Sequence, residues 1–497
     1  MALTACRVML LGIAQLALTG CGGGLITTVG PDYQGQGLTA DKRWQAELPL
    51  AHGGNPASLK RWWDRFDDPE LSRFLGAAQR ESATVAQARS RIDEARAGMV
   101  GAMAAGLPNL NTQVDIVRAE NTLGGPVFER TSYKAGLQSN WEVDLFGGIA
   151  RQREAALSQL GARTGAWHDA RVAVAVEVAN AYLGYRHCEA LVKIAEADAA
   201  SRKSSARLVN IAGQAGLRAP ADVALSNASA ADGQDLLIRQ RGVCERAIKS
   251  LVALTGLGEA EVRHRLTAQA DRIARLPSPP PFRLTGVPAE VLVQRPDLAV
   301  AEREVAEASA EIGVQEAKRY PRLSLSGNIT PTLQSVNGAA LYLAHTWQIG
   351  PTMTLPIFDA GKRAADVEAA RARYEATAAK FRATVRTAVR EVEEALVRLD
   401  NAERRLPEAR AALRGYRDNF RATEQLYRIG FGNLIEVEAS RRQALGAERT
   451  VADLEQERVS AWIALYRAAG GGWDDPAPPS QPTTPAHPPE FPGKDRS

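Results

Sequence analysis

Cysteine and histidine are the residue types in this sequence whose spacing could indicate metal or redox chemistry. The four cysteines are far apart, none forms a CxxC pair, and the six histidines stand singly, as His168, His187 and His264 do. A zinc site or an iron–sulfur cluster needs several such ligands at short, regular spacing. We therefore expect no metal and no cofactor, and we expect the histidines to be surface or interface residues.

Cys21 lies at the end of an N-terminal signal. Arg7 supplies a positive charge, an apolar run follows over residues 8–18, and the small pair Thr19-Gly20 directly precedes Cys21. This order is typical of a bacterial lipoprotein signal, which is cut before a cysteine that then carries lipid such as palmitate. The pattern predicts removal of residues 1–20 and lipidation of Cys21; the alternative is an ordinary signal peptide with an incidental cysteine.

Cys188 and Cys244 are equally far from Gly216, which is the candidate turn between two helices. Gly216 lies midway between them, with Cys188 before it and Cys244 after it. In two antiparallel helices that rise ~1.5 Å per residue, both cysteines would lie ~42 Å from the turn, at the same height. Adjacent thiols of a secreted protein are usually oxidised. We predict a Cys188–Cys244 disulfide; the alternative is two buried free thiols on different faces.

The motifs of common enzyme classes are missing from the sequence. It has no GxSxG, HExxH or P-loop motif, and no GxGxxG motif between a strand and a helix. Lys plus Arg number 61 and Asp plus Glu number 57, which is too even a balance for a chain whose main partner is nucleic acid. The sequence therefore predicts neither an enzyme nor a nucleic-acid-binding protein.

Composition and proline spacing favour very long helices. The 497 residues are 45% hydrophobic and only 6% aromatic, and Ala, Arg, Glu and Leu are frequent. Residues 149–213 contain no proline and residues 362–429 contain only Pro407, so each run could form a helix of ~60 residues and ~90 Å. Further helical runs follow at 222–257 and 434–468. Long antiparallel helices with Ala-rich seams are typical of coiled coils.

The chain contains two copies of one pattern, at a nearly constant spacing. Pro108 aligns with Pro321, and Phe146 aligns with Phe358. Together with the N-terminal signal and the proline-rich stretches, this repeat divides the chain into parts. We predict a signal peptide (1–20), an extended lipid-anchored segment (21–61), repeat 1 (62–275), a Pro-rich linker (276–287), repeat 2 (288–473) and a disordered Pro-rich tail (474–497).

Each copy also contains two segments in which apolar and polar side chains alternate. These segments are residues 110–117, 133–145, 323–329 and 347–355. A period of two with one apolar and one very polar face predicts four β-strands. The alternatives are hairpins packed on helices and a water-filled transmembrane barrel, and a polar inner face favours the barrel. Trp141 and Trp347 would then belong to an interfacial aromatic girdle, with core aromatics as the alternative.

Several longer motifs accompany this pattern. They are Val29-Gly-Pro-Asp-Tyr33, Trp62-Trp63 with Asp68-Pro-Glu-Leu71, Trp141-Glu-Val-Asp-Leu-Phe146-Gly-Gly148, Val287-Pro288 with Gln294-Arg-Pro-Asp297, Tyr320-Pro321, Leu355-Pro-Ile-Phe-Asp-Ala-Gly361 and Ala469-Gly-Gly-Gly-Trp473. Together with the lipoprotein signal and the repeat, they span nearly the whole mature chain. The chain resembles outer-membrane efflux channels of the TolC type, in the lipoprotein branch that serves resistance–nodulation–division (RND) pumps.

The resemblance implies a homotrimer whose fold is mainly α with a small antiparallel β part. In this family, four strands from each chain close one 12-stranded transmembrane β-barrel, which is continuous with a periplasmic barrel of coiled-coil-like helices. Four strands alone would leave edges exposed to lipid, and hydrocarbon does not tolerate such edges. The resemblance also implies a lipid-anchored protein in the outer membrane of a Gram-negative bacterium, extending into the periplasm.

The resemblance further implies roles for residues at two glycine turns. The turns at Gly216 and Gly430 would form the periplasmic tip, where the tunnel narrows and an adaptor protein docks. Acidic residues after each turn form a lumenal ring in some members, and Asp222 and Glu436 match them. Glu438 would be a further acid of this ring.

A second set of tip residues would hold the tip closed. A family tyrosine that helps lock the tip matches Tyr427, whereas its usual arginine partner falls on Gly432. Arg428 or Arg218 would then take the role of that arginine. A further family aspartate is replaced by Ala439.

The same turn residues also have plain structural explanations. Acids in a first helical turn favour the helix dipole whatever the protein does, which could explain Asp222 and Glu436. Gly216 and Gly430 could likewise be C-caps, since glycine ends helices by accepting a positive φ.

A channel of this family would do no chemistry and would use no nucleotide. It would be a passive conduit that exports drugs or other toxic small molecules, driven by an RND-type inner-membrane pump through a periplasmic adaptor, and so would contribute to antibiotic resistance. The alternative is a structural coiled-coil envelope lipoprotein without channel activity, which would need no polar-faced strands.

Overall fold

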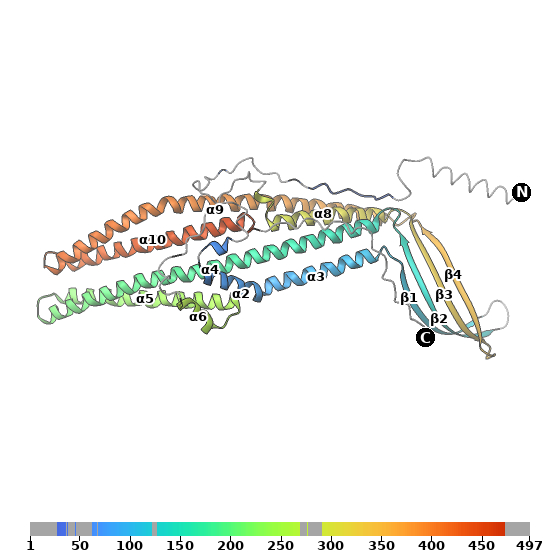
Figure 1. The fold of residues 1–497 in the computed structure, drawn as a ribbon, viewed down its shortest axis with the longest axis horizontal. Coiled ribbons are helices and arrows are strands. Elements are labelled where there is room, and N and C mark those ends of the chain that lie inside the picture. Colours follow the sequence, from blue (N-terminus) through green and yellow to red (C-terminus); the bar gives the residue numbers. More distant parts are fainter. Residues whose placement is uncertain are drawn as a thin grey trace, which may run out of the picture. The chain divides into compact units, whose positions relative to one another are not determined.

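A computed structural model shows a mainly helical protein with one small antiparallel sheet (Figure 1). The structure describes residues 27–35, 37, 45, 62–66, 68–121, 127–268, 276 and 291–472. The signal peptide with Cys21, most of the segment up to residue 61, the linker after Leu276, Trp473 and the tail 474–497 lie outside the described residues. The expectations for those parts therefore stay predictions, whereas the mainly α fold with a small β part is confirmed.

The described elements repeat one order. They are η2 (Trp63–Phe66), α2 (Pro69–Glu81), α3 (Ala83–Ala104), β1 (Asn109–Asn121), β2 (Phe128–Val143), α4 (Gly148–Gln214), α5 (Pro220–Thr255), α6 (Glu259–Thr267), α8 (Pro296–Ala317), β3 (Arg322–Val336), β4 (Tyr342–Thr354), α9 (Lys362–Arg428) and α10 (Leu434–Ala468). The series α3–β1–β2–α4–α5 recurs as α8–β3–β4–α9–α10, in agreement with the repeat in the sequence. Pro407 lies inside α9 and does not end it.

None of the described helices combines the length and the apolar composition needed to cross a membrane.

The chain divides into two compact units, and each unit draws segments from both copies. Unit 1 comprises residues 1–36, 93–160 and 302–379, and unit 2 comprises residues 37–92, 161–301 and 380–497. The helices α3, α4, α8 and α9 each have residues in both units.

Unit 1 contains the four-stranded antiparallel sheet, in the order β1-β2-β3-β4 (Figure 1). The central pair, β2 and β3, joins the two copies, with Leu137 opposite Ile329 and Trp141 opposite Leu325. Residues directly opposite each other in a sheet share a face. The register therefore gathers the polar residues of all four strands on one face and most apolar ones on the other, as the alternation predicts.

The motif Val29-Gly-Pro-Asp-Tyr33 is held by a buried arginine in unit 1. The guanidinium of Arg151 donates to the carbonyls of Val29 and Gly30 and to the carboxylate of Asp32, the last at 2.6 Å. Gly30 has φ +88°, and a Cβ on it would lie 2.4 Å from the Cα of Gly313. Close backbone approach thus explains why glycine stands at this position.

The core of unit 2 is built around Trp62, which is fully buried and stacks on Tyr466 with ring centres 4.6 Å apart. Asp68 caps the start of α2 by accepting hydrogen bonds from backbone N–H groups of its first turn. The same carboxylate accepts hydrogen bonds from the hydroxyl of Tyr182 at 2.8 Å and from Arg186 at 3.0 Å. A buried polar group that is bonded in this way fixes how α2 packs on α4.

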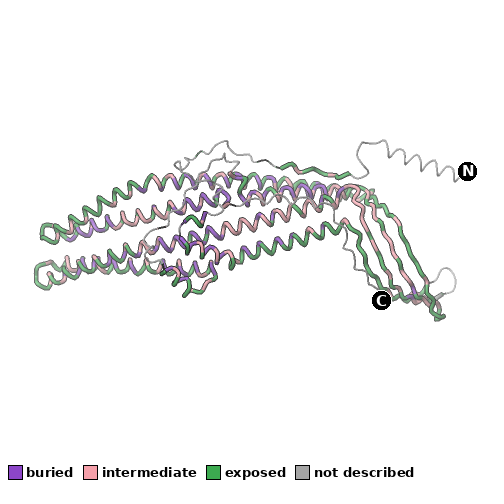
Figure 2. Tube along the Cα trace, in the orientation of Figure 1, coloured by how far each residue is buried: buried purple, intermediate pink, exposed green. Residues whose placement is uncertain are grey.

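The long helices of unit 2 pack through aliphatic and alanine-rich stripes. Buried residues alternate with exposed ones along the described helices (Figure 2). Leu183 of α4, Leu251 of α5, Leu396 of α9 and Ile463 of α10 are almost completely buried. Burial of such stripes, more than local propensity, stabilises helices of this length.

Candidate functional site

The first candidate site is the turn between α4 and α5. Gly216 has φ +70°, and the N–H of Leu217 donates to the carbonyl of Ala212 at 2.8 Å. This is the bond pattern of a Schellman motif, which needs a residue in the left-handed region. Pro220 begins α5, and Asp222 lies half-buried in its first turn. Gly216 therefore ends α4 and lets the chain reverse into α5.

The turn between α9 and α10 has the same construction. Gly430 has φ +86°, and the N–H of Phe431 donates to the carbonyl of Leu426 at 2.9 Å. Asn433 caps α10 by accepting the N–H of Glu436 at 2.8 Å, and its side-chain amide donates back to the exposed Glu436 carboxylate at 2.8 Å. Glu436 thus has a capping role at the start of α10, which agrees with the structural explanation of this acid.

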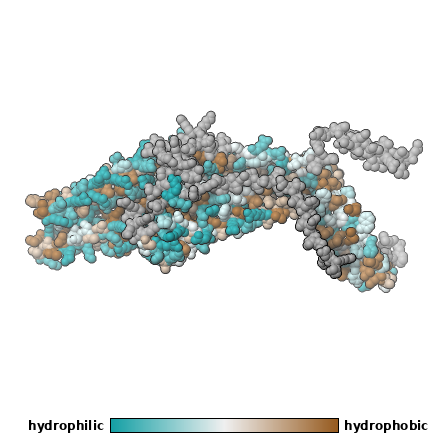
Figure 3. Space-filling model, viewed as in Figure 1, coloured by the Kyte–Doolittle hydropathy of each residue, from teal (hydrophilic) through white to brown (hydrophobic). Residues whose placement is uncertain are grey.

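Both turns expose large apolar side chains. Leu217 is 76% exposed and Phe431 is 83% exposed, and Ile429 and Ile435 beside the second turn are also exposed. Apolar surface is visible at the ends of these hairpins in Figure 3. Clustered exposed apolar side chains usually mark a contact surface for a partner.

Tyr427 contacts Arg218, which belongs to the other turn. The guanidinium carbon of Arg218 lies 4.7 Å from the centre of the Tyr427 ring, a distance at which a cation is attracted to the ring face. Arg428 instead pairs with Glu424 at 3.2 Å on its own helix. A Cβ on Gly432 would lie 2.9 Å from the backbone nitrogen of Tyr427, so a larger residue there would displace the backbone. Of the two candidate arginines, the structure brings Arg218 to the tyrosine.

Glu438 does not fit the expected ring of exposed acids. Its side chain is buried, Arg441 lies 2.5 Å and Arg202 3.8 Å from its carboxylate, and the hydroxyl of Ser229 donates to it at 2.6 Å. Asp198 pairs with Arg202 at 2.7 Å and balances its charge. An acid whose charge is compensated inside the chain projects little field into solvent, so the prediction for Glu438 is corrected to a packing role.

Arg202 and Arg441 were not among the residues singled out from the sequence. The signal for them is a pair of charged spacings, because Asp198 and Arg202 are four residues apart and Glu438 and Arg441 are three apart. Such spacings favour contact on one helix, but they are too common on exposed helices to identify a buried cluster.

The structure joins Cys188 of α4 and Cys244 of α5 in a disulfide. Their Cα atoms are 5.5 Å apart, and both residues are buried. This distance lies within the range that a disulfide requires. The two cysteines are equally far from Gly216 in the sequence, and they therefore lie equally far from the turn along the two helices.

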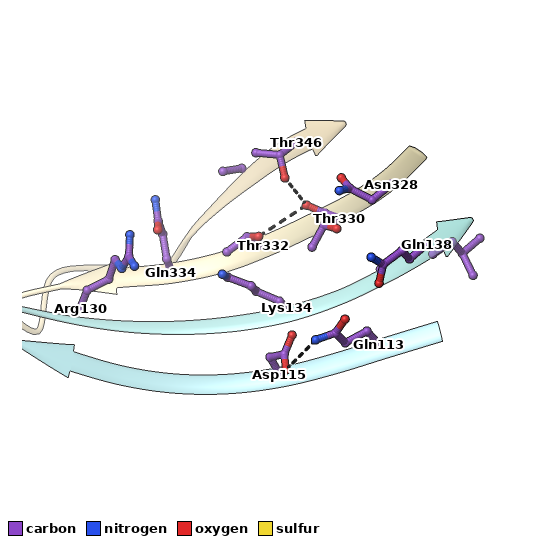
Figure 4. A pocket seen from close by; sticks show the side chains of 13 residues that line it. Gln113, Asp115, Arg130, Lys134, Gln138, Asn328, Thr330, Thr332, Gln334 and Thr346 are labelled. Carbon is purple, nitrogen blue, oxygen red and sulfur yellow. Dashed lines mark hydrogen bonds between the residues drawn. The ribbon is translucent and has the colours of Figure 1, made fainter. Parts of the chain in front are cut away.

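The polar face of the sheet forms an open hollow in unit 1 (Figure 4). Among its lining residues are Gln113, Asp115, Arg130, Lys134, Gln138, Asn328, Thr330, Thr332, Gln334 and Thr346. Asp115 lies opposite Lys134 in the register, and the hydroxyl of Thr346 donates to the Thr330 carbonyl at 2.9 Å. A face so rich in amides, hydroxyls and charges suits contact with water and polar solutes.

Trp141 and Trp347 lie at different heights along the sheet. Trp141 is half-buried and donates its ring N–H to the Gly106 carbonyl at 3.0 Å. It lies opposite Leu325 of β3, which in turn lies opposite Pro351 of β4. Trp347 is four residues from that level and is exposed, which corresponds to about 13 Å along a strand. Along the strand direction, the alignment of the two copies thus matches Trp141 with Met353 and not with Trp347; a place for the two tryptophans in an interfacial girdle stays a prediction.

Among the described residues, no group of three or more His, Cys, Asp or Glu side chains is arranged to hold a metal ion.

Comparison with known proteins agrees with these features. The sequence profile of the family described as outer membrane efflux protein matches residues 74–257 and 287–471. Outer membrane protein OprJ of Pseudomonas aeruginosa is 29% identical over 461 residues, which cover 90% of this chain and 93% of OprJ. Nodulation protein T of Rhizobium leguminosarum bv. trifolii is 26% identical over 477 residues, which cover 93% of this chain and 96% of that protein.

A solved structure described as the outer-membrane channel OprN has the same fold. It superposes with a TM-score of 0.80 at 27% sequence identity, covering 90% of this chain and all of OprN. The Campylobacter jejuni CmeC outer membrane channel superposes with a TM-score of 0.78 over 90% of this chain and 96% of CmeC, at 21% identity. That identity supports likeness of fold alone.

Proposed function

Because this chain belongs to the outer membrane efflux protein family, we propose that it is the passive outer-membrane conduit of a tripartite efflux system. The protein is located in the outer membrane, as its relatives are, and they are channel proteins rather than enzymes. The observation that carries the proposal is the sheet of unit 1, with one polar and one apolar face. That pattern suits strands between lipid and water.

The proposed channel is a homotrimer in which three sheets close one 12-stranded β-barrel, continuous with a periplasmic barrel of helices. The support is that β1 and β4 are edge strands of the sheet. Unpaired backbone groups at an edge are costly in hydrocarbon, and pairing with further copies satisfies them.

The proposed partners are a periplasmic adaptor, an RND-type inner-membrane pump and outer-membrane lipid. The adaptor would contact the turns at Gly216 and Gly430, where Leu217 and Phe431 offer exposed apolar surface. Lipid would be attached at Cys21, which lies outside the described residues.

The exported solutes would be small toxic molecules such as drugs. Relatives are named for antibiotic efflux and toluene efflux in Pseudomonas putida, and for pyoverdine export. Since similar channels carry such different names, we propose that the pump, and not this chain, selects the solute.

The proposed gate lies at the two turns. Stacking of Arg218 on Tyr427 ties one turn to the other within each chain. Asp222 and Glu436, repeated by the threefold axis, would place acidic charge near the narrow end and attract cations.

The test is conductance of the purified protein in planar lipid bilayers. We expect discrete open channels, and we expect Tyr427→Ala to open more often than the parent because the stacked contact is lost. A folded trimer without any conductance would contradict the channel and favour a structural envelope lipoprotein. Growth of a deletion strain across a panel of toxic compounds would then identify the solutes.

A further inference from the structure

Two cationic side chains in the hollow of the sheet have no carboxylate partner. Arg130 and Lys134 of β2 line this hollow on the polar face, and both are half-buried (Figure 4). In the part of the chain that the structure describes, neither forms an ion pair, and the buried Nε of Arg130 lacks a hydrogen-bond acceptor. On the opposite face, by contrast, Arg118 pairs with Glu129 at 2.7 Å. The two cations of the hollow can therefore attract a charge from outside the chain.

A single acid offsets these two positive charges. Asp115 lies opposite Lys134 in the register of β1 and β2, and its carboxylate accepts a hydrogen bond from the side-chain amide of Gln113 at 3.3 Å. The other residues that line the hollow are uncharged, and most of them carry amides or hydroxyls. Each chain therefore contributes more positive than negative charge to the hollow.

The excess positive charge lies at the level of Arg130. The residues opposite Arg130 are Ala119 of β1 and Val336 of β3, and neither carries a charge. Arg130 and Lys134 are four residues apart, which corresponds to about 13 Å along a strand. Physiological salt screens exposed charges beyond about 8 Å. Asp115, which is opposite Lys134, therefore does little to offset the charge of Arg130.

The repeated strand pattern does not require these cations. At the equivalent positions of β4, copy two has Tyr342 in place of Arg130 and Thr346 in place of Lys134. Both residues lie on the polar face of the sheet. A polar-faced strand of the same fold thus forms with neutral residues at both positions. The cations of β2 therefore point to a role other than strand pairing.

We infer that Arg130 and Lys134 form a weak anion-binding site on the polar face of the sheet, which attracts solutes that carry carboxylate or phosphate groups. This inference rests on the proposed channel, in which the polar face lines the pore, and it adds a preference for one class of solute. Rings of Arg and Lys side chains select anions in other pores.

The site is suited to transient binding. The hollow is open, and Asp115 lowers its net positive charge. Conduction requires a site that solutes enter readily and also leave readily. The site would therefore favour anionic solutes among those that the pump delivers, without retaining them. This preference is opposite in sign to the one proposed for the acids at the two turns.

The test is the ion selectivity of the full-length protein in planar lipid bilayers, measured as the reversal potential in a potassium chloride gradient. Arg130→Gln/Lys134→Gln should lower the ratio of chloride to potassium permeability by roughly twofold or more, because potentials near charged protein surfaces reach several kT. Asp115→Asn should raise the same ratio. Each variant is compared with the parent, so that the acids at the turns contribute equally to both.

Arg118→Gln is the matched control, because Arg118 belongs to the same sheet and lies on the opposite face. It should leave the permeability ratio unchanged, and the charge-conserving variant Arg130→Lys/Lys134→Arg should keep the parent ratio. Citrate serves as the anionic probe. Added to the bilayer chamber, citrate should reduce the potassium chloride current of the parent, and the same block in Arg130→Gln/Lys134→Gln should need several-fold more citrate.

The outcomes separate the anion site from the channel. A conducting trimer with the same permeability ratio and the same citrate block in parent and double Gln variant overturns the anion site and leaves the proposed channel standing. A ratio that falls equally in Arg118→Gln does the same. If the double Gln variant fails to fold, Asp115→Asn decides, and an unchanged ratio there overturns the site. A folded parent trimer without conductance overturns the channel, and the anion site with it.

Discussion

Glu436 and Glu438 are two residues apart in α10, yet their surroundings differ completely. Glu436 is exposed and bonds with the cap residue Asn433, whereas Glu438 is buried between Arg202 and Arg441. A cap residue contributes little to stability, but breaking a buried ion pair leaves an uncompensated charge. The two positions therefore provide a matched comparison on one helix.

We predict that Glu438→Ala destabilises the protein strongly and Glu436→Ala weakly. Loss of the buried partner should cost about 3–5 kcal/mol, and loss of the cap contact should cost about 1 kcal/mol or less. Urea unfolding of the helical circular dichroism signal measures both. Equal midpoints for the two variants would mean that the buried charges are compensated in some other way.

Glu436→Gln tests the gate and keeps the shape of the side chain. We expect a lower cation preference in single-channel recordings, because three negative charges leave the narrow end of the proposed pore. Glu120→Gln, in β1, serves as a charge-matched control remote in sequence from the turns. An unchanged cation preference at Glu436→Gln would leave this residue with its capping role only.

His168 should make stability depend on pH. Burial, together with the positive charge of Arg171, lowers the pKa of His168 from 6.5 to about 4. Between these two values the unfolded chain binds a proton that the folded chain does not, so stability falls as the pH falls from about 6.5 to about 4.

The His168→Gln variant should therefore lose less stability than the parent between pH 6.5 and 4, in urea unfolding at several pH values. Part of the slope should remain, because burial also lowers the pKa of His187 despite the nearby Asp453 carboxylate. Identical slopes in parent and variant would show that His168 titrates in the same way in both states.

At the scale of elements, two features hold α4 and α5 together as a hairpin. Gly216 reverses the chain, and the Cys188–Cys244 disulfide links the two helices well away from that turn. In α9 and α10, buried aliphatic residues and ion pairs such as Arg410 with Glu455 join the helices instead. The two copies thus share a turn and differ in how their helices are held.

We predict that the double variant Cys188→Ala/Cys244→Ala lowers stability by about 2–4 kcal/mol, because the bond constrains an unfolded loop. The two cysteines are 56 residues apart in sequence. Urea unfolding measures the loss, and peptide mapping without reductant should recover both cysteines in one linked peptide. Recovery as separate, alkylatable peptides would contradict the bond.

At the scale of the whole molecule, membrane affinity should come from the strands more than from the lipid. A single acyl chain binds a membrane only marginally, and several chains still fall short of an integral span. We predict that Cys21→Ser, with a cleavable signal peptide in place of residues 1–20, still fractionates with the outer membrane. A folded variant that is wholly soluble would contradict the proposed barrel.

Short-range patterns in the sequence determined the elements and the turns. Alternation predicted the strands, long runs with at most one proline predicted α4 and α9, and equal spacing around Gly216 predicted the disulfide. Strand period, helix rise and glycine conformation depend on near neighbours, so local patterns can specify them. The burial of Glu438, the contact of Arg218 with Tyr427 and the different heights of Trp141 and Trp347 were decided by tertiary structure. These features depend on residues that are far apart in the sequence, and on helix rotation and strand register, which no local pattern specifies.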